Sequence, residues 1–344
     1  MVDASLRRGI SDAFVEQLRE GVLHPVLERV QHDDTLSLEI RSGYINVSYR
    51  GGNLLKVSAT ARPDRFTTYF DWRYCGTADD YRCALGERLP ATIADADDAR
   101  AWVDAFSQHK QAMDIRFSKH PKLEREYQQA VVRDNNRHAT GRASDYVVVD
   151  IEYAQSPRAF PEQKADYRFD MVGFRWPVAG GTRKKGVATP VIMEMKTGDA
   201  ALASNPVRPG TDAVQAGLAK HVRDIERFLE PAAGEEMSRP YQLLRQELLE
   251  IFTIKQRLGL PSLPTNMRKL HVAELTPRPE VVFVIANHTP ASTVFSRELL
   301  TLPARRHADY FVATVQWAGY ALFAKNMRPL DEFIEELAGG QRES

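Results

Sequence analysis

The spacing of hydrophobic and polar residues changes several times along the first half of the chain. Apolar residues recur at helical spacing between residues 10 and 30, where Pro25 is expected to break or kink the helix. Residues 35 to 74 alternate instead, and Arg50-Gly-Gly-Asn53 separates two β-rich runs, which predicts an antiparallel meander with a hairpin at that point. Helical spacing returns over residues 97 to 117 and 122 to 137, on either side of a His-Pro pair.

The second half of the chain alternates between short apolar runs and helical stripes. Strands are expected at residues 146–153, 167–176, 189–197 and 281–286, edge strands at 311–317 and 320–323, and helices at 211–229, 241–258 and 327–337. The order from residue 122 to 286 is helix, three strands, helix and a strand. This order predicts an α/β fold with a central mixed sheet flanked by helices, preceded by an N-terminal antiparallel β region.

Two of the expected strands carry charged residues among apolar neighbours. Tyr167-Arg-Phe-Asp-Met-Val-Gly-Phe174 has Asp170 in its middle, and Thr189-Pro-Val-Ile-Met-Glu-Met-Lys-Thr-Gly198 holds Glu194 and Lys196. Side chains two apart on a strand point to the same face, so this carboxylate and ammonium should stand side by side. Charged groups are rare in buried strands unless they are paired, metal-bound or catalytic. The pattern therefore predicts a functional cluster.

The residue types suit phosphodiester hydrolysis, which needs charge neutralisation at the phosphate and an activated water. Mg²⁺ prefers oxygen ligands and usually takes one or two carboxylates. Asp170 and Glu194 would supply these carboxylates, and the backbone carbonyl of Met195 would add a third protein ligand. Lys196 would orient the attacking water or balance negative charge.

Phe169-Asp170-Met171, Glu194-Met195-Lys196 and the order of elements together resemble the PD-(D/E)XK nuclease superfamily, over about half of the chain. The resemblance implies a restriction-endonuclease-like core and a phosphodiesterase that uses Mg²⁺ (or Mn²⁺). It also implies a nucleic-acid partner, DNA rather than RNA, in a bacterial restriction or anti-phage setting. Phe169 stands where the family has a proline.

The same resemblance suggests two further site residues. The family often places a glutamate on the first helix, where Glu126 fits and Glu124 is the alternative. Some members use a polar residue on the helix after the third strand, and Gln215 occupies that position. The expected domains are residues 1–95, a helix and β meander for recognition or interaction, and residues 96–344, the nuclease-like domain with its C-terminal strands and helix.

Several polar residues allow more than one interpretation. Asp150 and Glu152 share a face of their strand and either extend the acidic site or lie at its margin. Thr182-Arg-Lys-Lys-Gly186 is either solvated charge or a local contact for a phosphate backbone. His221, beside an apolar stripe, is expected to be a core or boundary residue. A second Glu-x-Lys, at Glu162, lies in a polar stretch and is given no role.

Composition narrows the classes of function. Lys+Arg and Asp+Glu are equal at 46 each, so any basic contact with nucleic acid must be local. The two cysteines, Cys75 and Cys83, are expected to be reduced thiols. Serine-hydrolase, P-loop and zincin motifs are missing from the sequence. There is no apolar signal core or membrane-spanning run, so we expect a cytoplasmic protein without a membrane partner.

A second hypothesis of a different class stays open. A chain of this kind can keep the nuclease fold without turnover and act as a nucleic-acid-binding or scaffold component. In either case the N-terminal β region would be the surface for a homodimer or a partner protein.

Overall fold

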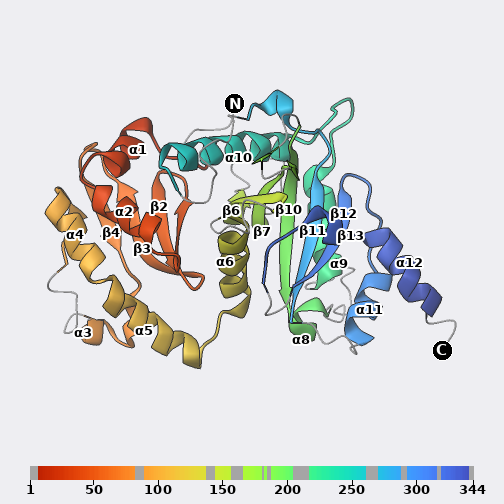
Figure 1. Ribbon diagram of the computed structural model, residues 1–344, viewed down its shortest axis with the longest axis horizontal. Coiled ribbons are helices and arrows are strands. Elements are labelled where there is room, and N and C mark those ends of the chain that lie inside the picture. Colours follow the sequence, from red (N-terminus) through yellow and green to blue (C-terminus); the bar gives the residue numbers. More distant parts are fainter. Residues whose placement is uncertain are drawn as a thin grey trace. The chain divides into compact units, whose positions relative to one another are not determined.

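The structure is a computed structural model that describes residues 7–81, 89–136, 144–155, 166–179, 182–183, 187–203, 217–260, 270–287, 293–315 and 319–340. Packing divides the chain into two compact units (Figure 1). Unit 1 comprises Met1–Gln129 and Glu250–Met267, and unit 2 comprises Ala130–Leu249 and Arg268–Ser344. The expected domain boundary between residues 95 and 96 lies inside unit 1.

Unit 1 is built on a five-stranded sheet in which neighbouring strands pair antiparallel in the order β1-β2-β3-β4-β5. The strands are β1 (Leu36–Ile40), β2 (Tyr44–Tyr49), β3 (Gly52–Ala59), β4 (Phe66–Tyr69) and β5 (Thr92–Ile93). The helices are α1 (Asp12–Arg19), α2 (His24–His32), η2 (Trp72–Cys75), α3 (Ala78–Tyr81), α4 (Ala96–Asp104) and α5 (Phe106–Lys119). The predicted meander is confirmed.

Local sequence explains the turns of unit 1. Arg50 and Gly51, between β2 and β3, have φ values of 47° and 71°, the pair of left-handed conformations that a tight hairpin turn requires. The predicted break near Pro25 is also confirmed, because this proline lies in the first turn of α2, where it costs no helical hydrogen bond.

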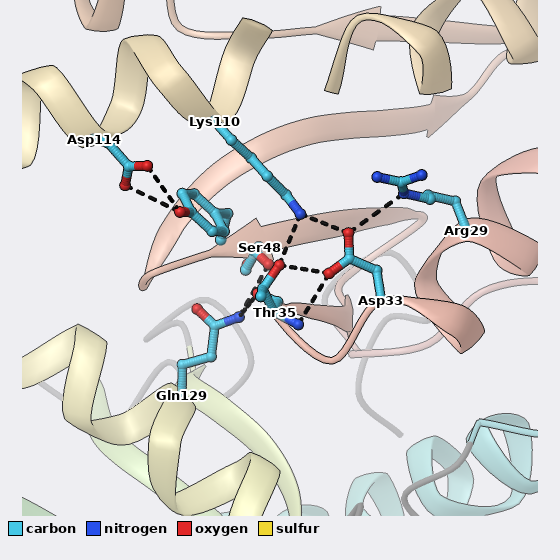
Figure 2. Close-up of polar contacts among 8 residues, drawn as sticks. Arg29, Asp33, Thr35, Ser48, Lys110, Asp114 and Gln129 are labelled. Carbon is cyan, nitrogen blue, oxygen red and sulfur yellow. Dashed lines mark hydrogen bonds and ion pairs between the residues drawn. The ribbon is translucent and has the colours of Figure 1, made fainter. Parts of the chain in front are cut away.

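A polar cluster ties the helices of unit 1 to the end of its sheet (Figure 2). Lys110, on α5, contacts the Asp33 carboxylate at 2.6 Å and the Thr35 hydroxyl at 2.7 Å. Gln129 donates to the carbonyls of Thr35 and Ser48, each at 3.1 Å. These groups satisfy one another, and we interpret the cluster as structural.

Unit 2 contains a six-stranded mixed sheet, in the order β13-β12-β11-β10-β7-β6, flanked by helices (Figure 1). The strands are β6 (Tyr146–Gln155), β7 (Tyr167–Arg175), β10 (Thr189–Thr197), β11 (Glu280–Ala286), β12 (Asp309–Val315) and β13 (Arg328–Pro329), with a separate pair β8 (Val178–Ala179) and β9 (Thr182–Arg183). β10, β11 and β12 run parallel, and the other pairs are antiparallel. The predicted mixed sheet is therefore confirmed.

The helices of unit 2 are α8 (Gly198–Leu202), α9 (Leu218–Leu229), η5 (Val272–Glu274), α11 (Thr293–Leu300), η6 (Ala324–Asn326) and α12 (Leu330–Gly340). Two more helices, α6 (Leu123–Asn136) and α10 (Arg239–Arg257), have residues assigned to each of the two units. None of the helices in the described ranges has the length and apolar character that crossing a bilayer demands.

One expected strand is wrong. Residues 320–323 are not a strand, because side chains take their backbone hydrogen bonds: Asn135 contacts the Tyr320 carbonyl and the Leu322 amide, and Ser144 contacts the Leu322 carbonyl. The two-residue β13 is the edge instead, so β12 is not an edge strand. The core of the sheet is β11, whose residues are all buried.

Candidate active site

Glu194 and Lys196 lie on β10, one of the two innermost strands of the six-stranded sheet. Thr189 to Lys196 are all buried, and the side chains of Glu194 and Lys196 are only 1% and 6% exposed. Their predicted position on one face is confirmed, since Lys196 Nζ lies 3.9 Å from Glu194 Oε2. Two opposite charges are thus held close together in a water-poor part of the sheet.

Asp170 reaches the same place from the neighbouring strand. β7 pairs antiparallel with β10 from Arg175 opposite Thr189 to Met171 opposite Met193. The next step of this register places Asp170 opposite Glu194, and the backbone pairing ends there. Instead, the Asp170 carboxylate accepts a hydrogen bond of 2.8 Å from the Met195 amide, and its Oδ2 lies 3.8 Å from Lys196 Nζ.

The cluster has a defined place in the topology. β10 and β11 are parallel, and Glu194 and Lys196 lie in the C-terminal half of β10. In α/β sheets, ligands usually bind just outside the carboxyl ends of parallel strands. The three charged side chains therefore lie at the end of the sheet where binding sites commonly form.

Glu194 has the most unusual environment of the three. His221, near the start of α9, places Nδ1 2.8 Å from Glu194 Oε2, a short polar contact. Burial alone would raise the pKa of the Glu194 carboxyl, but the proximity of His221 and then of Lys196 lowers its pKa below the ordinary value. Glu194 is therefore a buried group that its neighbours keep ionised.

A divalent cation fits part of this arrangement. Glu194 Oε1 is buried and has no hydrogen-bond partner among the residues that the structure describes, so one hard oxygen is free to bind an ion. The Asp170 carboxylate lies beside it. The Met195 carbonyl accepts a 2.8 Å hydrogen bond from Lys196, and its second lone pair could still coordinate.

The donor set is small. Within the described ranges, no group of three or more His, Cys, Asp or Glu side chains is arranged to hold a metal. Two carboxylates and a carbonyl, completed by water and phosphate oxygens, are what a Mg²⁺ site would use here.

The two site residues suggested only by the resemblance stay predictions. Glu126 lies on α6 within unit 1, where its carboxylate pairs with Arg50 at 3.0 Å. Arg50 also contacts Asp114 at 2.8 Å. All three residues belong to unit 1, so this ion pair of Glu126 lies within that unit. Gln215 lies outside the described residues.

The acidic residues of β6 take different register positions relative to Asp170. Ile151 is opposite Met171 and Tyr153 is opposite Phe169, which places Glu152 opposite Asp170. Glu152 has a φ of 50° and is half-buried. Asp150 is buried and lies opposite Val172, further along the strand.

The two remaining sequence features fall largely outside the described part of the chain. Of the basic segment, only the backbone of residues 182 and 183 is described, as strand β9, and residues 184–186 lie outside. The second Glu-x-Lys, at residues 162–164, also lies outside.

His221 is the site residue whose role the sequence did not reveal. The buried residues of α9 include Leu218, Val222 and Ile225, and His221 falls three positions after the first and four before the last. A polar residue at the spacing of an apolar stripe faces the sheet. This spacing is the feature of the sequence that could have indicated a role for His221 in the site.

Comparison of this chain with family models, with curated proteins and with solved structures found no match.

Proposed function

We propose that this chain is a metal-dependent nuclease of the PD-(D/E)XK type, with a restriction-endonuclease-like core, that hydrolyses phosphodiester bonds in DNA. The observation that carries the proposal is the convergence of Asp170, Glu194 and Lys196 from two adjacent strands, with the Lys196 amine within 4 Å of both carboxylates. A buried cluster of this kind is costly to fold and is typical of a functional site.

Each side chain would have a separate task. Asp170 and Glu194 would hold Mg²⁺ or Mn²⁺, which when bound neutralises charge on the phosphate and favours ionisation of water. Lys196 would donate a hydrogen bond to the attacking water and orient its oxygen toward phosphorus. As the new P–O bond forms from that water, the proton of the water would pass to solvent, and the bond to the leaving oxygen would break with its electron pair on that oxygen, which would take up a proton from solvent.

The burial of the cluster supports this assignment of tasks. Lys196 is tied to the Met195 carbonyl at 2.8 Å, so its amine has a fixed position rather than a range of rotamers. A preorganised cation in a site with little water stabilises developing negative charge far better than the same group in solvent. We therefore expect Lys196 to contribute a large share of the rate enhancement.

The test is a cleavage assay over several substrates. Wild type and Lys196→Ala would be incubated with linear, circular and single-stranded DNA and with RNA, in Mg²⁺, Mn²⁺ or EDTA. We expect the wild type to cut DNA only with metal, and the variant to be slower by about 100-fold or more. Absence of cleavage by the wild type on every substrate, or equal cleavage by the variant, would overturn the proposal.

A further inference from the structure

His221 contacts Glu194 more closely than Lys196 does. Its Nδ1 lies 2.8 Å from Glu194 Oε2, whereas Lys196 Nζ lies 3.9 Å from the same oxygen. The His221 side chain is 27% exposed, and the Glu194 side chain is 1% exposed. The histidine therefore bridges from a partly solvated helix to a carboxylate that solvent hardly reaches.

The contact is asymmetric across the Glu194 carboxylate. Both carboxylate oxygens are buried, and the contacts that His221 and Lys196 make at 2.8 and 3.9 Å fall on Oε2, while Oε1 has no hydrogen-bond partner in the part of the chain that the structure describes. A carboxylate held on one oxygen presents the other in a fixed direction. Side chains that hold a metal ligand in this way commonly set both its orientation and the affinity of the site.

The position of His221 is itself fixed. Leu218, Val222 and Ile225 of α9 are buried and anchor the helix, so the imidazole starts from a rigid backbone. The adjacent Lys220 pairs with Asp224 on the same helix and not with Glu194. The contact with the site is thus specific to one residue of this turn.

We infer that His221 is a positioning residue, which holds Glu194 by Oε2 so that Oε1 is presented to the metal ion. This inference rests on the proposed function and adds a residue to it. It predicts that a side chain with an N–H at the position of Nδ1 preserves the site. Asparagine meets this requirement, since its Nδ2 is the same number of bonds from Cα, and leucine does not.

The test measures Mn²⁺ binding by calorimetry, which does not depend on turnover, in wild type, His221→Asn, His221→Leu and Glu194→Gln. Lys220→Ala is the matched control on the same turn. We expect Kd to rise about 10- to 100-fold in His221→Leu, to stay within a few-fold of wild type in His221→Asn, and to be unchanged in Lys220→Ala. The melting temperature in EDTA checks that each variant is folded. If His221→Leu does not fold, His221→Asn still tests the inference.

The outcomes separate the two proposals. Binding that Glu194→Gln abolishes but His221→Leu leaves intact, or even tightens, would overturn the role of His221 and leave the metal site standing. Equal weakening by His221→Asn and His221→Leu would also overturn it, because the retained N–H would then have no effect. Lack of Mn²⁺ binding by the wild type would overturn the proposed function and this inference with it.

Discussion

His109 offers a quantitative test of how unit 1 is held together. This residue of α5 is fully buried, and neither ring nitrogen has a hydrogen-bond partner among the described residues. Its ring stacks on Phe70 at 4.0 Å with an interplanar angle of 13°, and Trp102 lies 5.8 Å away. Burial lowers the pKa of His109 from 6.5 to about 4, because the charged imidazolium would lose its hydration.

The sign and size of the effect follow from that shift. The unfolded chain binds a proton below pH 6.5 and the folded chain only below about 4, so His109 reduces stability progressively between these values. The slope is about 1.4 kcal/mol per pH unit, which gives a loss of about 2 kcal/mol at pH 5 and about 3 kcal/mol below pH 4. Above pH 6.5 the penalty disappears.

The perturbation is His109→Phe, which keeps an aromatic ring against Phe70 and cannot take up a proton. Urea unfolding, followed by tryptophan fluorescence, would be measured at pH 7.5, 6 and 5 for both proteins. We expect the stability of the variant relative to wild type to increase by about 2 kcal/mol from pH 7.5 to pH 5. His120→Phe, at the exposed end of α5, is the control and should show no such change.

Comparing the two proteins cancels every other group that titrates in this range. A parallel loss of stability by wild type and His109→Phe as the pH falls would refute the effect of His109. His109→Leu, a smaller side chain, gives a second test if phenylalanine overpacks the site.

Two further substitutions probe the cores of the two units. Lys255→Met should lower the free energy of unfolding of unit 1 by about 3 to 5 kcal/mol, because the buried Glu39 carboxylate, 3.2 Å from Lys255 Nζ, would lose its ion-pair partner. Adding Glu39→Leu should recover most of that loss in urea unfolding. Gly173→Ala should destabilise unit 2 by about 3 kcal/mol because its Cβ would lie 2.0 Å from the Val147 carbonyl, whereas Gly339→Ala, with open space, should leave the melting temperature unchanged.

The sequence predicted those parts of the fold that depend on local pattern. The turn at Arg50 and Gly51 follows from the conformational preferences of the residues in the turn itself. The shared face of Glu194 and Lys196 follows from the period of a strand. That the Asp170 strand neighbours the Glu194 strand is favoured by their order along the chain, because consecutive strands usually pair. These features need only local pattern and the order of the elements.

Other features depend on contacts between distant segments. The register that sets Asp170 opposite Glu194 is fixed by the pairing of β7 and β10, and the hydrophobic pattern alone does not specify it. The contact of His221 with Glu194 requires the packing of α9 on the sheet. The apolar segment at Tyr320 favours a strand, but Asn135, which is distant in sequence, donates a side-chain hydrogen bond to the Tyr320 carbonyl.

The central claim is that the cluster on β7 and β10 cleaves DNA with a bound metal, and Asp170→Asn tests it most directly. Asp166→Asn is the matched control, because Asp166 is exposed just before the same strand and pairs with Arg168. On the substrate that the wild type cuts best in Mn²⁺, the account predicts that Asp170→Asn lowers the cleavage rate by about 100-fold or more and that Asp166→Asn does not. Equal rates for the two variants would contradict it.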